Sequence, residues 1–265
     1  MKLKSSRCRI DSPAGGMNAI LMRPVKQDRP VPGILWIHGG GYVTGTASMA
    51  YYTAGRKLAK HYGAVLLAPN YRLALKAPYP AALEDCYAAL QYLYTRAEEL
   101  GVDKSRIIVG GESAGGGLTA ALCIYARDRG GIPISFQIPL YPMLDCRDTD
   151  SSRHSHSHGW GTRRNHWGWH RYLREQYGTD DVPSYASPSR ETNYAGLPPC
   201  YTYIEDEEPF YTETLTYVKN LQEAGVEAHA DIFHDNIHGF DTMMWTKNAK
   251  EAKKKIIAAA EKYMG

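Results

Sequence analysis

Runs of consecutive apolar residues alternate along this chain with longer segments in which apolar positions repeat with a helical period. The runs are typical of strands buried on both faces, and they lie at 34–37, 64–68, 106–109, 134–140, 200–204 and 227–233. The segments between them predict helices at 50–61, 81–100, 118–122, 210–224 and 246–263. This alternation indicates a mostly parallel sheet with helices on both faces, so we expect an α/β fold.

Two further patterns help to place the elements. Residues 6–23 predict an opening hairpin whose turn lies at 13–16. In the helix predicted over 81–100, the apolar side chains are separated by four, three and four positions, as one face of a helix requires: Leu83, Tyr87, Leu90 and Tyr94.

The alternation stops between residues 145 and 185. This segment is rich in aromatic residues, arginines and histidines, and its five histidines are His154, His156, His158, His166 and His170. Residues near Tyr172 are compatible with a short helix, but no run here is typical of a sheet strand. We expect a cap inserted over one end of the sheet, because functional loops of such folds gather at the carboxyl ends of the strands.

Composition limits the classes of function. The chain has 265 residues, 43% hydrophobic and 22% charged, and a formal net charge of +3. These values are typical of a globular protein with one domain over 1–265, with no nucleic-acid partner and no membrane span. The five cysteines form no C-x-x-C pair, which favours reduced thiols in a cytoplasmic protein. The sequence is compatible with a homodimer.

The segment Gly111-Glu112-Ser113-Ala114-Gly115 carries the strongest chemical signal. It follows an apolar strand and precedes a helix-forming stretch. In that context the G-x-S-x-G pattern places an exposed nucleophilic serine on a strained turn, where a side chain at either glycine would strike a neighbouring element. Ser113 is therefore the candidate nucleophile.

A second glycine-rich run, His38-Gly39-Gly40-Gly41-Tyr42, also follows an apolar strand. Bare backbone N–H groups in such a loop can stabilise a developing oxyanion, and the motif selects Gly40, Gly41 and Ala114. A phosphate-binding loop is the alternative, but it requires a lysine shortly after the glycines, which this sequence lacks.

A nucleophilic serine needs a base and a third group that orients the base. The order serine, acid, histidine points to His238, which follows the last strand, with His234 as its close rival. The acid is expected in the loop after residue 204, where Glu208 precedes a proline that suits a first helical turn. Asp206 is the alternative acid.

Together these residues resemble the hormone-sensitive-lipase-like branch of the α/β-hydrolases, a family of carboxylesterases. The resemblance spans about residues 30–245 in unbroken order, and its motifs are 38–41, 71–74, 111–115, Tyr141-Pro142, Asp145, 208–210 and 238–240. It implies an α/β-hydrolase fold, an acyl-enzyme formed on Ser113 and an oxyanion hole made by Gly40, Gly41 and Ala114. It also implies that His38 is structural.

Two departures from the family pattern have expected consequences. The family usually carries helical cap residues before the first strand, whereas this chain begins almost at that strand, so we expect the cap to consist mainly of 145–185 and the site to be open. Glu205 stands where such sequences generally have glycine. If that position requires a positive φ, glutamate is expected to cost roughly 1 kcal/mol or more and to shift Glu208.

The sequence thus predicts a serine carboxylesterase that hydrolyses small short-chain acyl esters without a cofactor or metal. Two alternatives come from other classes. The histidine-rich segment could make a metal-dependent hydrolase, because alternate histidines in a strand, or histidines four apart in a helix, share a face. The other alternative is a binding protein in which the three triad residues are present but catalyse no reaction, because folds of this kind carry unrelated functions.

Overall fold

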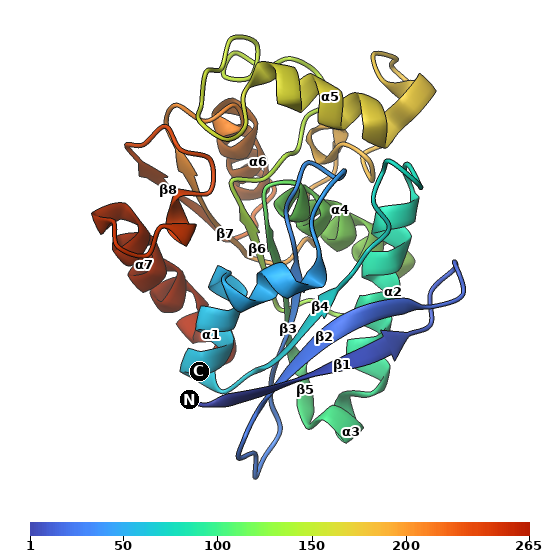
Figure 1. Ribbon diagram of the computed structural model, residues 1–265, viewed down its shortest axis with the longest axis vertical. Helices are drawn as coiled ribbons and strands as arrows, with labels where there is room; N and C mark the ends of the chain where they lie inside the picture. Colours follow the sequence, from blue (N-terminus) through green and yellow to red (C-terminus); the bar gives the residue numbers. More distant parts are fainter.

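The computed structural model describes residues 1–265 and contains one eight-stranded sheet in the order β1-β2-β4-β3-β5-β6-β7-β8 (Figure 1). The strands are β1 (Leu3–Ile10), β2 (Met17–Pro24), β3 (Val31–Ile37), β4 (Val65–Pro69), β5 (Val102–Glu112), β6 (Phe136–Leu140), β7 (Cys200–Glu205) and β8 (Ala228–Phe233). The first two strands form the antiparallel hairpin, β2 also pairs antiparallel with β4, and all other pairs are parallel. The expected mostly parallel sheet is confirmed.

Helices cover both faces of this sheet. The α-helices are α1 (Ala54–Tyr62), α2 (Ala81–Thr95), α3 (Ala97–Leu100), α4 (Ala114–Arg129), α5 (Thr162–Leu173), α6 (Tyr211–Glu223) and α7 (Lys247–Met264), with short 3-10 helices η1 (Ala47–Tyr51), η2 (Arg174–Gln176), η3 (Pro188–Arg190) and η4 (Phe240–Thr242). Helices α1 and α7 pack against each other, and α2 packs against α4 (Figure 1). None of the helices combines the length and apolar character needed to cross a membrane.

Two predicted helices are each divided in two. The helix expected over 81–100 forms α2 and α3, with Arg96 between them. The segment expected as a single helix over 50–61 contains the end of η1 and then α1, separated by Tyr52 and Thr53. The Thr53 hydroxyl donates to the Ala50 carbonyl at 3.2 Å, and such a local side-chain bond competes with a continuous helix. The break matters because it leaves Tyr52 exposed at the edge of a pocket that Ser113 also lines.

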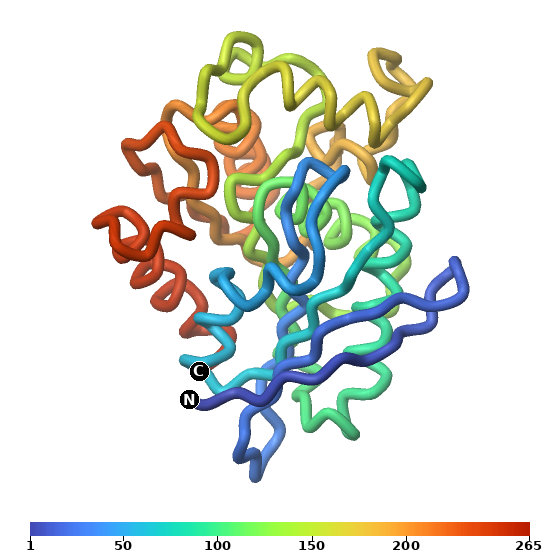
Figure 2. Tube along the Cα trace, viewed as in Figure 1, coloured from blue at the N-terminus to red at the C-terminus, as the bar shows by residue number.

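The segment 145–185 lies beyond the carboxyl ends of the parallel strands, as Figure 2 shows in yellow-green and yellow. It contains α5 and forms no strand of the sheet, as the sequence predicts. Three buried side chains of α5, Trp169, Tyr172 and Leu173, join the main hydrophobic core. The cap is therefore packed onto the sheet domain through apolar contacts, which stabilise its position.

The buried indole of Trp36 on β3 depends on small neighbours. A Cβ at Gly110 on β5 would overlap this indole. The indole N–H also donates to Glu112 at 2.9 Å, so the ring has little freedom to move. We expect Gly110→Ala to lower the free energy of unfolding by about 1–3 kcal/mol, as overpacking of a core does. Urea denaturation measures this change.

Gly131 supplies the matched control. It is exposed, and a Cβ there would meet no atom within 4 Å. Gly131→Ala should leave the free energy of unfolding unchanged or raise it by about 0.4–1 kcal/mol, because alanine lowers the conformational entropy of the unfolded chain. Equal effects of the two substitutions would contradict the packing argument.

Candidate active site

Ser113 occupies the turn between β5 and α4. Its backbone has φ 57° and ψ −121°, a conformation that L-residues rarely adopt. Side chains at the flanking glycines would collide with the backbone, at Ile37 for Gly115 and at Ile37 and Gly115 for Gly111. The turn therefore has the strained geometry that the G-x-S-x-G pattern predicts, with both glycines required by close backbone approach.

Three side chains from three loops form a hydrogen-bonded chain. His238 Nε2 lies 2.9 Å from Ser113 Oγ. His238 Nδ1 contacts the Glu208 carboxylate, at 3.0 Å from Oε2 and still closer to Oε1. Glu208 is buried, and the His238 side chain is 13% exposed. This is the arrangement in which an imidazole can take a proton from a hydroxyl while a carboxylate fixes its tautomer.

The His238 ring is held by packing as well as by hydrogen bonds. The rings of Tyr141 and Phe210 both stand edge-on to it, with centroid distances of 5.2 and 5.6 Å. The His238 N–H donates to the carbonyl of His158 in the cap at 2.9 Å. The His158 N–H in turn donates to the carbonyl of Asn236 at 2.7 Å. The cap thus positions the loop that carries the base.

The alternative histidine and the alternative acid named from the sequence, His234 and Asp206, pair with each other away from Ser113. His234 Nδ1 contacts Asp206 Oδ2, and the His234 side chain is 95% exposed. The two histidine–carboxylate pairs are therefore alike in type but differ in burial and in access to Ser113. The structure brings His238 and Glu208 to the serine and leaves His234 and Asp206 at the surface.

Glu205 avoids the backbone strain that a positive φ would cause, because its φ is not positive. Its side chain is wholly buried, and neither carboxylate oxygen has a hydrogen-bond partner. Burial, reinforced by the nearby Glu208 charge, raises the pKa of Glu205 well above its usual range. Burial therefore favours the uncharged form of this carboxyl group.

The glycine loop presents two unused backbone donors. The N–H groups of Gly40 and Gly41 donate to no acceptor within the protein, while the Gly40 carbonyl accepts from Val43 and Thr44 at 3.1 and 3.0 Å. Ala114 is the first residue of α4, where the N–H has no acceptor within the helix. These are the three positions that the sequence selects for an oxyanion hole.

His38 supports this loop and does not face the reaction. It is buried, stacks on Tyr71 at a centroid distance of 4.1 Å, and its Nδ1 lies 2.8 Å from the Gly39 carbonyl. Burial lowers the pKa of His38 to about 4, so its ring is neutral at neutral pH. The Tyr71 hydroxyl donates to the His38 carbonyl at 3.0 Å. The motif 71–74 thus holds the glycine loop in place.

A pocket of about 320 Å³ opens at Ser113. Its lining comes from the glycine loop, the break before α1, the cap and the His238 loop: Gly39, Gly40, Gly41, Met49, Tyr52, Thr53, Glu112, Ser113, Tyr141, Trp160, His238, Gly239 and Thr242. The indole of Trp160 lies directly against Gly41, since a Cβ there would overlap it. Ser113, His238 and the unused N–H groups of Gly40 and Gly41 therefore lie around one cavity.

Sequence reasoning missed several residues of this pocket. Trp160 lies in the aromatic-rich segment 145–185 without being singled out, Tyr52 lies inside the helix predicted over 50–61, and Met49 lies just before that helix. Tyr141 was noted only within a family motif, yet its hydroxyl donates to Asp241 at 2.8 Å beneath His238. Only the aromatic enrichment of the cap pointed toward any of these residues.

The histidine-rich segment does not assemble a metal centre. Within residues 1–265, no group of three His, Cys, Asp or Glu side chains is placed to hold an ion. His166 Nε2 contacts Asp148 at 2.7 Å as an exposed pair. The segment touches the candidate site through the backbone of His158, as described above, and through Trp160.

Comparisons with known proteins agree with this geometry. A family model described as the alpha/beta hydrolase fold matches residues 34–242. Esterase LipI of Mycobacterium tuberculosis is 32% identical over 234 residues, covering 87% of this chain and 73% of that protein. An ethyl acetate hydrolase of Pseudomonas putida is 29% identical over 231 residues, covering 84% and 71%. A solved bacterial heroin esterase matches with a TM-score of 0.95 and 33% identity, covering 99% and 85%.

Burial of Glu205 predicts a pH-dependent stability. Because its pKa is raised in the folded state, the folded protein binds more protons than the unfolded chain above pH 4.5, and stability falls as pH rises. Gln carries no such proton, so Glu205→Gln should gain stability over the parent between pH 5 and pH 8. The difference in the free energy of unfolding between the variant and the parent should grow by at most about 1.4 kcal/mol per pH unit. Urea denaturation at both pH values measures it, and exposed Glu207→Gln, the control, should show no such trend.

Proposed function

The chain belongs to the hormone-sensitive-lipase-like family of α/β-hydrolases and is a carboxylic ester hydrolase, and from this premise we propose that Ser113, His238 and Glu208 form its catalytic triad. The single observation that carries the proposal is the hydrogen-bonded chain from Ser113 Oγ through His238 to Glu208. The triad acts on esters of short acyl chains and needs no cofactor.

The reaction proceeds through an acyl-enzyme. Ser113 Oγ attacks the ester carbonyl carbon while His238 Nε2 takes its proton, and Glu208 stabilises the resulting imidazolium. His238 then protonates the leaving alcohol oxygen as the carbonyl–oxygen bond breaks. Water attacks the acylated serine by the same route and releases the acid. Because the base must be neutral, we expect activity to fall under acidic conditions.

The oxyanion that forms at each step lies beside the three backbone N–H groups. Gly40 and Gly41 N–H are free of protein acceptors, so they need no rearrangement to donate to it. Such preorganised donors stabilise the transition state more than the ground state, and losing one typically costs about 3 kcal/mol. The Trp160 indole supports this role because it covers the loop at Gly41.

The preference for short acyl chains rests on the shape of the pocket. Its volume of about 320 Å³ is small, and the Trp160 indole forms a wall directly beside Gly41. A relative named for ethyl acetate hydrolysis supports the same size class.

We also propose that residues 1–265 act as one domain with 145–185 as its cap, since one hydrophobic core includes side chains from Ile10 to Met264 and from α5.

The first test removes the nucleophile. Ser113→Ala should lower kcat/KM for 4-nitrophenyl butyrate by about 10⁴-fold or more, because the remaining groups cannot form the acyl-enzyme. Intact-mass spectrometry with diethyl 4-nitrophenyl phosphate should show one adduct on the parent and none on the variant. A variant that keeps most of its turnover would place the chemistry elsewhere.

The two histidine–carboxylate pairs give a matched control for this test. His238→Ala should lose about as much activity as Ser113→Ala. His234→Ala, at the exposed pair with Asp206, should keep its activity within a factor of two. Equal losses in the two histidine variants would show that the hydrogen bond to Ser113 does not define the base.

The second test concerns acyl length. Each methylene that a pocket cannot accommodate lowers kcat/KM by roughly tenfold or more. We expect activity to decline beyond butyrate in a series of 4-nitrophenyl esters, and Trp160→Ala to shift the optimum toward longer chains because it removes the wall beside Gly41. Trp167→Ala is the control, since Trp167 lies on α5 and is exposed. An unchanged profile in Trp160→Ala would refute the role of this wall.

A further inference from the structure

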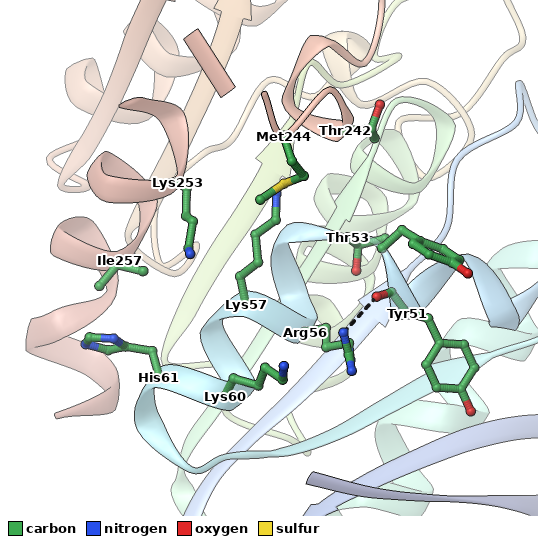
Figure 3. Close-up of a pocket in the computed structure, with 11 residues that line it drawn as sticks. Tyr51, Thr53, Arg56, Lys57, Lys60, His61, Thr242, Met244, Lys253 and Ile257 are labelled. Carbon is green, nitrogen blue, oxygen red and sulfur yellow. Dashed lines mark hydrogen bonds between the residues drawn. The ribbon is translucent and has the colours of Figure 1, made fainter. Parts of the chain in front are cut away.

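A second cavity adjoins the catalytic pocket on the side of α1 and α7. It has a volume of about 500 Å³ and shares Tyr52, Thr53 and Thr242 with the catalytic pocket. Figure 3 shows the side chains of Lys57 and Lys253 extending into it from α1 and α7. The two cavities are therefore neighbours, with Tyr52, Thr53 and Thr242 at their common border.

This cavity is strongly cationic, and we call it the cationic groove. Its basic lining residues are Arg56, Lys57, Lys60, His61 and Lys253, and no Asp or Glu is among its lining. None of the four Lys and Arg side chains pairs with a carboxylate, whereas other lysines of α7 do. Lys255 lies 2.6 Å from Asp231, and Lys262 is close to Glu227. The positive charge that faces the groove is thus not neutralised by the protein.

Lys57 ties the groove to the catalytic centre. Its ammonium donates to the Asp241 carbonyl at 3.2 Å, three residues after the base. Partial burial lowers the pKa of Lys57, and the nearby charge of Lys253 acts in the same direction. The carboxyls of Asp241 and Glu112 favour the ammonium, but burial raises the pKa of both, that of Glu112 to about 8. Lys57 makes no salt bridge with either carboxyl group, so its ammonium would gain from an external anion.

The position of the groove relative to His238 indicates which part of a substrate reaches it. In the proposed mechanism His238 protonates the leaving alcohol, so the alcohol part lies on the His238 side of the pocket. Thr242, which both cavities share, belongs to the loop just after His238. The alcohol part is therefore the one directed toward the groove.

We propose that the cationic groove binds an anionic group, a carboxylate or a phosphate, on the alcohol part of the ester that Ser113 attacks. This inference rests on the proposed function. Its substrate class is a short acyl ester of a hydroxy acid or of a hydroxyalkyl phosphate. Hydrolysis consumes one water, breaks the acyl carbon–oxygen bond and releases the short acid together with the anionic alcohol.

The test compares matched anionic and neutral esters. The anionic probes are 6-acetoxyhexanoate and 6-acetoxyhexyl phosphate, the neutral match is 6-acetoxyhexanamide, and acetate release is measured for each. At low salt we expect kcat/KM for the better anionic probe to exceed that for the amide by about 5-fold or more, since each exposed ion pair contributes modestly. The preference should shrink toward one in 0.5 M NaCl because salt screens exposed charges. The better probe identifies the anion.

Variants of exposed lysines locate the effect. The double variant Lys60→Gln/Lys253→Gln should reduce the ratio of kcat/KM for the anionic ester to that for the neutral ester by about 3-fold or more, because the substitutions remove two ammonium groups from the groove. Lys254→Gln is the matched control: Lys254 is exposed on the same helix and does not line the groove, so the ratio should stay unchanged. A ratio near one in the parent, or an unchanged ratio in the double variant, overturns the proposal.

Ser113→Ala separates the two hypotheses. If hydrolysis of the neutral amide ester depends on Ser113 but no anionic preference exists, only the inference about the groove fails. If Ser113→Ala retains that hydrolysis, the proposed triad fails and the groove inference fails with it. If the preference and its Ser113 dependence are both observed, both hypotheses are supported.

Discussion

The strained backbone of Ser113 is the constraint on which the rest of the site depends. A residue at φ 57° and ψ −121° costs about 1–3 kcal/mol, so the surrounding structure must hold it there. It does so through three backbone hydrogen bonds: Ser113 N–H donates to Leu140, and the Ser113 carbonyl accepts from Gly117 and Met143, all at 2.9–3.1 Å. The turn is thus fixed by α4, by the end of β6 and by the loop after it. The parallel order of β5 and β6 is therefore a requirement of the chemistry.

Burial also controls the charge beneath the imidazole. Four carboxyl groups gather there, and three of them have a raised pKa because they are buried: Glu112, Glu205 and Asp241. Burial therefore favours the uncharged form of these three groups. Glu208 is the carboxyl group whose oxygens contact the imidazole ring.

The sequence predicted those features that depend on short-range patterns. Apolar runs located every parallel strand, and the order of motifs located Ser113, Glu208 and His238, because strand ends and turn residues are encoded locally. Burial of Glu205 was not predictable in this way, since the position of its side chain depends on how the loop after β7 packs. The division of the helix at Thr53 has a similar cause, because a single hydroxyl bond to Ala50 competes with a regular helix. The wall formed by Trp160 requires a contact with Gly41 across more than a hundred residues.

The histidine-rich part of the cap illustrates why side-chain identity alone was misleading there. Alternating histidines suggested metal ligands, yet the contacts of His158 with the catalytic loop use its backbone N–H and carbonyl, and Ser157 adds a hydroxyl bond to Asn236 at 3.2 Å. Backbone bonds of this kind tolerate many side chains, so the sequence at these positions carries little information about their role. These bonds fix the position of the loop that carries Asn236 and His238. The cap cannot move far from the sheet without withdrawing the carbonyl that His238 N–H uses, so substrate access and the placement of the base are physically linked.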